Sequence, residues 1–148
     1  MSNTIAFYNH TRKLFANGEV SLADLKFMLV NEHTFDASHT NISSIEGDEV
    51  HGSGWTEGGE AIANASIQVA DTDESTLTGD NISVTATGGD IGPADGGVIY
   101  DSDSGAPLWY VAYLDDESDP NPQTAGEGTD FNVTWASNII ARWAAPSA

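Results

Sequence analysis

Residues 48–67, DEVHGSGWTEGGEAIANASI, decide the fold, because they form either a loop that holds a ligand or a turn between strands. The stretch lacks the glycine–lysine pair of a phosphate-binding P-loop, and no strongly apolar strand leads into it as a dinucleotide motif requires. A Gly-Gly pair followed by an alternating apolar run is typical of a hairpin. We therefore predict a structural turn in which the tryptophan is a packing anchor. Its residues are Gly52, Gly54, Trp55, Gly58 and Gly59.

Short apolar and β-branched runs recur on both sides of this turn. Residues 25–31, LKFMLVN, predict a strand that is buried on both faces. The aromatic run LWYVAYLDD at 108–116 predicts a second clear strand. Further strands are expected at 61–70, 81–87, 98–102, 131–137 and 138–145, the last of which is a separate strand or the end of the preceding hairpin. Loops are expected at 71–76, 88–97 and 117–130, and at 32–48 with one helical turn near Ser43–Ile45. This spacing predicts an all-β fold, an antiparallel β-sandwich or barrel-like domain with long acidic loops.

The composition is that of one folded domain. A chain of 148 residues is the usual size of a single domain and is long enough to bury a core. Four tryptophans, four tyrosines and five phenylalanines argue against disorder despite the high net charge. The absence of cysteine excludes disulfides, thiolate metal sites and cysteine nucleophiles. No run approaches the ~20 apolar residues of a membrane span, and the opening residues are too polar for a signal peptide.

The charge is strongly acidic, with a net value of −19 at pH 7. The four basic residues lie toward the ends of the chain, at Arg12, Lys13, Lys26 and Arg142. A body without cations repels the phosphate backbone, so we expect no nucleic acid among the partners. Anionic membrane surfaces are disfavoured for the same reason. A solvated acidic surface that keeps the protein soluble accounts for most of the carboxylates.

The opening segment, residues 1–20, has two possible roles that the sequence leaves open. It is either an N-terminal arm that docks on a partner or a first strand packed in the parent domain, which then spans residues 21–148 as a single β domain. If it is an arm, edge pairing with a partner would supply main-chain hydrogen bonds. The contact residues would be Phe7, Tyr8, Arg12, Lys13, Leu14 and Phe15.

Signals for catalysis or metal binding are weak. Asp71-x-Asp73 and Asp101-x-Asp103 place carboxylates at alternate positions, as calcium loops do, but neither continues as an EF-hand does. They are weak candidates, and solvated loops are favoured over a metal or cofactor. The four histidines, His10, His33, His39 and His51, have no metalloprotease spacing, and we interpret them as loop residues without a shared role. None of them lies in the glycine-flanked serine elbow of a hydrolase.

Five segments carry a resemblance to a known family. In chain order they are LKFMLV (25–30), EVHGSGWTEGG (49–59), VIYDSDSG (98–105), LWYVAYLDD (108–116) and DFNVTW (130–135). They resemble a family of small virion structural proteins of tailed bacteriophages, associated with the head or the tail. The likeness covers most of residues 20–137, and the glycine-rich motif is its most specific part. Two departures are Lys26, which stands one position early in its strand, and the additional glycines of residues 86–97.

The resemblance implies a non-enzymatic virion protein without catalytic residues. The role expected first is a capsid decoration (cement) protein on the outer capsid surface, a homotrimer that contacts the major capsid protein and bridges its subunits. An interface of the standard ~1,600 Å² is within reach of a domain of this size. One alternative is a tail or fibre component that binds a host receptor. Another, from a different class, is a calcium-dependent carbohydrate-binding module or hydrolase with Trp55 and Trp109 as stacking residues.

Overall fold

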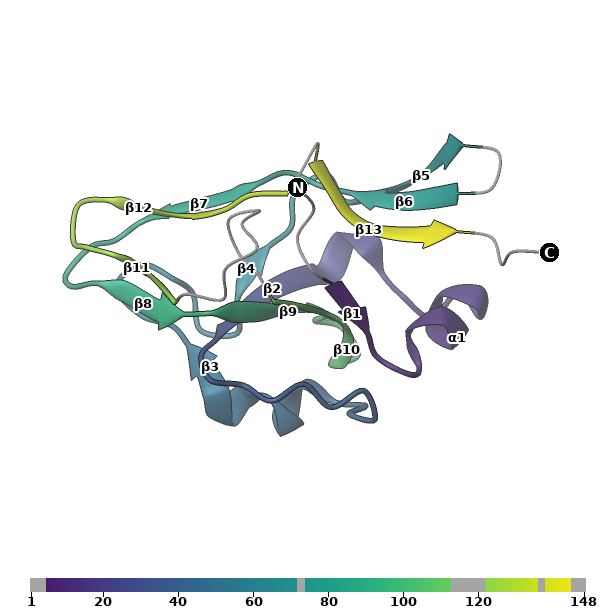
Figure 1. The fold of residues 1–148 in the computed structure, drawn as a ribbon, viewed down its shortest axis with the longest axis horizontal. Coiled ribbons are helices and arrows are strands. Elements are labelled where there is room, and N and C mark those ends of the chain that lie inside the picture. Colours follow the sequence, from purple (N-terminus) through teal and green to yellow (C-terminus); the bar gives the residue numbers. More distant parts are fainter. Residues whose placement is uncertain (1–4, 72–73, 113–121, 136–137, 145–148) are drawn as a thin grey trace.

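The computed structural model describes residues 5–71, 74–112, 122–135 and 138–144. The fold is mostly β with several antiparallel sheets, as the spacing of the apolar runs predicted (Figure 1). The strands are β1 (Ile5–Phe7), β2 (Leu25–Val30), β3 (Glu49–Val50), β4 (Glu60–Ala61), β5 (Ser66–Asp71), β6 (Glu74–Thr78), β7 (Ile82–Thr85), β8 (Ile91–Ala94), β9 (Gly96–Asp101), β10 (Ala106–Val111), β11 (Gln123–Ala125), β12 (Asp130–Val133) and β13 (Ile139–Ala144). The helical elements are α1 (Thr11–Ala16) and three 3₁₀ turns, η1 (Leu22–Asp24), η2 (Ile42–Ser44) and η3 (Glu46–Asp48).

The largest sheet has the order β1-β10-β9-β2-β3, and β4 also pairs with β2. All of its pairs are antiparallel. Strand β2 confirms the prediction for residues 25–31, because alternate side chains of a strand point to opposite faces and both faces are covered here. Leu25, Phe27 and Leu29 belong to the main core, whereas Met28 and Val30 belong to a second cluster on the other face.

A second layer covers the main-core face of this sheet. It consists of the three-stranded sheet β13-β6-β5 and the pair β12-β7, and the pair β11-β8 lies beside the end of the large sheet. Buried residues from these strands, among them Leu77, Phe131 and Ile140, share one cluster with Phe27 and Trp109. Two layers packed through one apolar core make the fold sandwich-like, as predicted.

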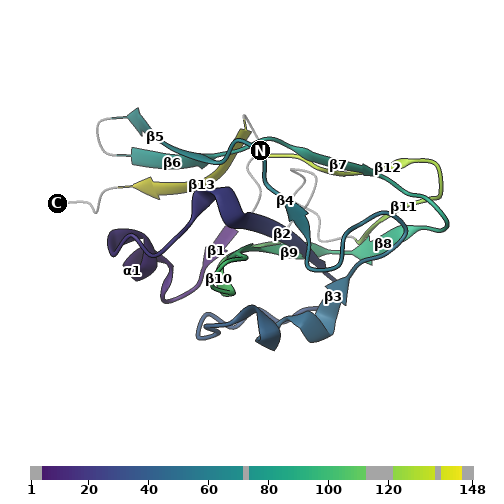
Figure 2. The ribbon, with the colours of Figure 1, turned by 180° about the vertical axis from the view of Figure 1, so that it is seen from behind.

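The connection between β2 and β3 covers the opposite face of the large sheet. In Figures 1 and 2, which are opposite views, β7 and β12 lie above this sheet and the segment with η2 and η3 lies below it. Ile42 and Ile45 from this segment pack with Val98 and Tyr100 of β9. The predicted helical turn near residues 43–45 is therefore present, as two 3₁₀ turns that carry apolar side chains into the second cluster.

Several predicted loops contain strands. Residues 71–76 include the start of β6, residues 88–97 include β8 and the start of β9, and β11 lies inside the predicted loop 117–130. The predicted strand 61–70 is divided into β4 and β5 by Asn64, which has a φ of 57°. Strand β13 pairs with β6 rather than β12, so Ile139–Ala144, within the predicted strand 138–145, is a separate strand and not the end of the preceding hairpin. Residues 113–116 of the predicted strand 108–116 lie outside the described residues.

The opening segment is packed into the domain. Strand β1 pairs with β10 in the register Ile5 with Val111 and Phe7 with Trp109, which makes it the edge strand of the large sheet. Tyr8 is 1% exposed and belongs to the second cluster. Residues 5–7 therefore have the second of the two possible roles: they are the first strand of the parent domain. The arm interpretation is wrong for them because they add to the sheet of their own chain.

Candidate interaction surface

Helix α1 is fixed beside the large sheet by its first residues. Thr11 is fully buried, and its hydroxyl donates a hydrogen bond of 2.6 Å to the carbonyl oxygen of Leu108. Nε2 of His10 lies 2.6 Å from the carbonyl oxygen of Pro107, which can only accept, so this nitrogen is the donor. The two bonds join the start of the helix to consecutive residues of β10. The remaining helical residues are thereby held at one place on the surface.

Trp109 is the apolar anchor beneath this helix. Its side chain is 0% exposed, and its ring makes an edge contact with Phe7 at 5.9 Å and a tilted contact with Phe15 at 5.4 Å between centroids. Aromatic pairs at such separations add about 0.5–1.5 kcal/mol beyond the area they bury. The indole therefore links β1 and α1 to the centre of the molecule.

An open apolar groove lies between α1 and the sheet of β5, β6 and β13. These strands extend past the large sheet on the side where α1 lies (Figures 1 and 2). The register aligns Ile67 with Leu77, and Leu77 with Ala141, so all three lie on the sheet face turned toward the core. Leu77 and Ala141 are buried, but Ile67 on the outermost strand is 39% exposed because the core ends before it. The groove has a volume of about 510 Å³ and is lined by Arg12, Phe15, Ala16, Ile67 and Ser75.

The groove carries positive charge on an otherwise acidic molecule. Arg12 and Lys13 are exposed neighbours on α1, and together they are half of the basic residues of a chain with a net charge of −19. The Arg12 guanidinium carbon lies 4.2 Å from the centroid of the Phe7 ring, which places the cation at the rim of the groove. An apolar groove beside two cations can accept a partner segment that combines apolar side chains with a carboxylate.

The six residues predicted as arm contacts occupy three different environments. Tyr8 is buried, and Phe7 and Leu14 are partly buried against the main core. Phe15 packs on Trp109 and also lines the groove. Only Arg12 and Lys13 are largely exposed. A partner could therefore reach these two side chains and one edge of Phe15. Ile67 and Ser75 complete the groove from distant positions that the sequence did not single out.

The glycine-rich stretch forms a tight turn rather than a ligand loop. Gly52 and Trp55 exchange two main-chain hydrogen bonds of 2.9 and 3.1 Å, so Ser53 and Gly54 are the two residues of a hairpin turn. Both have positive φ values, 56° and 107°, which such primed turns require. At Gly59 a side chain would overlap the carbonyl oxygen of Phe27. The glycines therefore serve the chain's own geometry.

Trp55 and Trp109 are unavailable for stacking on a sugar. Trp55 is 2% exposed and makes an edge contact of 5.6 Å with Phe131, and Trp109 is fully buried. A carbohydrate-binding module needs exposed aromatic faces. The burial of both candidate residues removes the main support for that alternative.

The predicted calcium candidates do not converge on a site within the described residues. The Asp101 carboxylate is 2% exposed and accepts hydrogen bonds from the main-chain nitrogens of Ser21 (3.0 Å) and Asp103 (2.9 Å). It joins η1 to the turn after β9, which is a structural role. Asp71 belongs to β5, Asp103 is exposed, and Asp73 lies outside the described residues. In the described ranges no group of three or more histidine or carboxylate side chains is placed to hold a metal ion.

A polar and aromatic cluster on the opposite side of the large sheet was not anticipated. Phe35 stacks on Tyr110 with centroids 5.5 Å apart and makes an edge contact with Tyr8 at 5.0 Å. The His33 ring lies 5.8 Å from Tyr110 and 6.4 Å from the His39 ring. His33 and His39 are loop residues, as interpreted, but they share one packed cluster, which that interpretation did not include. The N-x-H-x-F alternation of residues 31–35 is the one sequence signal that could have indicated it.

The phenols of this region predict a loss of stability at alkaline pH. Burial raises the pKa of Tyr8, and the neighbouring Tyr110 and Asp36 raise it further. Burial likewise raises the pKa of Tyr100 and of Tyr110. Above about pH 10 the unfolded chain loses tyrosine protons that the folded chain retains, so the free energy of unfolding should fall as the pH rises.

Thermal unfolding across alkaline pH tests this expectation. The melting temperature of the wild type should fall steeply above about pH 10, where an ordinary tyrosine ionises. Tyr8→Phe, which keeps the ring contact with Phe35, should show a shallower fall and a nearly unchanged melting temperature at pH 7. An identical alkaline slope for the two proteins would show that Tyr8 does not contribute.

Comparison with known proteins gives no assignment. No family model, no curated protein and no solved structure matches the chain. Within the described ranges, none of the helices has the length and apolar character needed to cross a membrane. The groove beside α1 is therefore the feature on which a functional proposal rests.

Proposed function

We propose that this protein is a non-enzymatic structural protein of tailed-phage virions, acting as a capsid decoration (cement) protein. In this role it sits on the outer capsid surface as a homotrimer and bridges subunits of the major capsid protein. The groove formed by Arg12, Phe15, Ala16, Ile67 and Ser75 is the contact with the shell. The acidic remainder of the surface faces solvent and keeps virions apart by charge repulsion.

The observation that carries this proposal is the coincidence of exposed cations and an apolar groove on an acidic domain. The side chains of His10 and Thr11 donate hydrogen bonds to main-chain carbonyls of β10 and hold α1 in place, so the groove is formed before a partner arrives. A preformed site loses little conformational entropy on binding. The resemblance of residues 49–59 and 130–135 to small virion proteins supplies the phage setting.

Neutralising the two cations should weaken attachment to the shell. Arg12→Gln combined with Lys13→Gln is expected to lower the affinity for capsid shells by about tenfold or more, which corresponds to 1.4 kcal/mol or more. Co-sedimentation with shells that lack the protein measures this, and wild-type binding should itself weaken with added salt. Substitution tests the cations more specifically than deletion of the segment, because deletion would also remove β1 from the sheet.

The matched control neutralises the other two basic residues. Lys26→Gln with Arg142→Gln changes the net charge by the same amount but leaves the groove intact, and it should bind as the wild type does. In the same assay Ile67→Asp should also reduce binding, while Gln68→Asp, an equal charge change at an exposed neighbour, should not. Full binding by the Arg12/Lys13 variant would exclude the groove as the shell contact.

A further inference from the structure

Buried polar atoms without hydrogen-bond partners gather beneath the segment that follows β2. Four of them, in the part of the chain that the structure describes, are Oη of Tyr8, Oδ1 of Asn31, Nε2 of His33 and Nδ1 of His39. Native proteins satisfy nearly all buried polar groups with protein atoms, ordered water or ions. Leaving one unsatisfied is destabilising, because the group loses its hydrogen bonds to water. Such a concentration points to an occupant that supplies the missing interactions.

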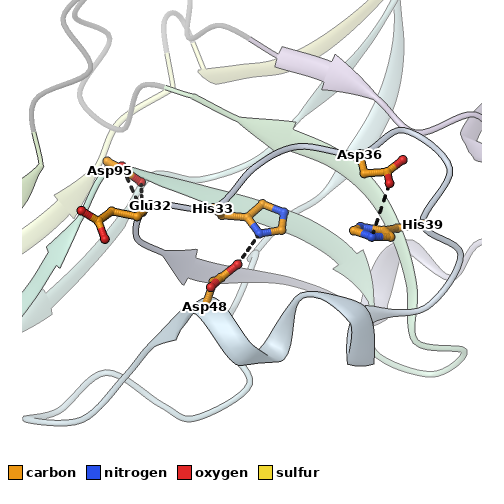
Figure 3. Close-up of polar contacts among 6 residues, drawn as sticks. All are labelled: Glu32, His33, Asp36, His39, Asp48 and Asp95. Atoms are coloured by element: carbon orange, nitrogen blue, oxygen red, sulfur yellow. Dashed lines mark hydrogen bonds and ion pairs between the residues drawn. The ribbon is translucent and has the colours of Figure 1, made fainter.

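The hydrogen bonds of the two histidines determine what that occupant must be. Nδ1 of His33 lies 2.8 Å from a carboxylate oxygen of Asp48, which can only accept, so Nδ1 carries a proton, and in the neutral imidazole Nε2 presents a lone pair. Nε2 of His39 lies 3.8 Å from a carboxylate oxygen of Asp36, an ion-pair distance, and Nδ1 of this ring has no hydrogen-bond partner. Figure 3 shows each imidazole with one nitrogen toward its aspartate. In the neutral rings the two remaining nitrogens can act as electron-pair donors to a cation or to a water proton.

The burial of His33 makes it unlike a surface histidine. Its side chain is 3% exposed, whereas that of His39 is 25% exposed, so one ligand is fixed in the protein and the other can adjust. The ring centroids are 6.4 Å apart. Two imidazoles on one tetrahedral zinc ion, with Zn–N near 2.0–2.1 Å, have centroids roughly 5–6 Å apart. The observed separation is slightly longer, so the partly exposed His39 ring would have to move toward His33 when an ion binds.

We propose that His33 and His39 form a binding site for a divalent transition-metal ion of the zinc type. Nε2 of His33 and Nδ1 of His39 are the ligands, and water completes the coordination. Asp48 is a positioning residue, because it accepts the hydrogen bond of the other His33 nitrogen, as carboxylates behind metal-bound imidazoles do, and Asp36 lies at ion-pair distance from His39. Imidazole nitrogens select zinc, copper or nickel over calcium and magnesium. The ion would link residues 33 and 39 and so fix the conformation of the segment between β2 and β3.

The first test uses the full chain, freed of metal with a chelator, and Zn²⁺ as the probe. Binding is measured by titration calorimetry in millimolar Mg²⁺. This hard cation occupies the acidic surface but leaves the imidazoles free. One Zn²⁺ should bind per chain and raise the melting temperature. His39→Gln should weaken binding at least about tenfold, and Asp48→Asn about 10–100-fold, since it acts through His33. His51→Gln, at an exposed histidine outside the cluster, should bind as the wild type does.

X-ray absorption at the zinc edge provides a second readout that does not depend on stability. The expected spectrum contains two imidazole ligands in the wild type and one in His39→Gln, a variant whose partly exposed position keeps the fold intact. Coordination by oxygen alone, or unchanged affinity in His39→Gln, would overturn the proposal and assign the zinc to surface carboxylates. The absence of any zinc-dependent rise in melting temperature would equally overturn it and leave ordered water as the occupant.

Discussion

Replacing Gly97 by alanine is expected to lower the free energy of unfolding by about 3 kcal/mol, because the change overpacks the centre of the core. Gly97 lies in β9 between Leu29 of β2 and Val111 of β10. A methyl group there would overlap the ring of Phe27 and come within 2.9 Å of the carbonyl oxygen of Met28. Neither neighbour can withdraw, since Phe27 is 0% exposed and the carbonyl belongs to the paired strand. Urea unfolding followed by circular dichroism measures the loss.

Gly47→Ala is the matched control for this prediction. Nothing lies within 4 Å of a side chain added at Gly47, and its φ is not in the left-handed region. The same chemical change at this exposed position should alter stability by no more than about 0.5 kcal/mol. Equal effects at the two glycines would mean that the Phe27 ring is not seated over Gly97.

Trp109→Ala should produce a still larger loss, about 3–5 kcal/mol, since it removes one of the largest fully buried side chains. The indole is fully buried and contacts both Phe7 and Phe15, so its removal loosens β1 and α1 together. Hydrogen exchange should therefore rise most in residues 5–16, in addition to the global loss seen in urea.

Two further variants separate packing from other effects of this change. Trp109→Phe keeps an aromatic ring against Phe7 and Phe15 and should lose less stability than the alanine variant. Ile67→Ala also removes a large apolar side chain, but one that is 39% exposed, and it should cost much less. A Trp109→Ala protein with unchanged exchange in residues 5–16 would contradict the role of the indole as the anchor of that segment.

The strands that follow from the sequence are those whose own residues carry the signal. β2 and β10 have apolar and aromatic residues in continuous runs, because both faces of the large sheet are covered. The glycine pattern of residues 52–59 likewise specifies its turn locally, through positions that need positive φ. These elements depend little on the remainder of the chain.

The strands that were missed are stabilised by their neighbours instead. β6, with the sequence ESTLT, is polar and resembles a loop, yet it is paired on both sides by β5 and β13. β8 contains Gly92 and Pro93, which usually mark loops, and it pairs with β11 on one side only. Tertiary pairing overrides local propensity in both cases.

The candidate sites were only partly predictable for the same reason. Arg12 and Lys13 stand out in an acidic chain, but the groove beside them also needs Ile67 and Ser75 from a different sheet. His33 and His39 are close in sequence, yet their shared environment depends on Asp48 and Tyr110. Sites assembled across long sequence separations leave no spacing pattern to detect.

The pairing of β1 with β10 has a consequence for how the chain is made. Thr11 and Leu108, which are joined by a hydrogen bond, are 97 positions apart, so the first strand leaves the ribosome long before its partner exists. Until then the nascent chain exposes Phe7, Tyr8 and Phe15, a hydrophobic segment that chaperones would be expected to hold. Closing so long a loop is entropically costly, and folds dominated by distant pairings fold slowly. The docking of β1 is therefore expected to be a late step in folding, and α1 and the groove beside it form only when that step is complete.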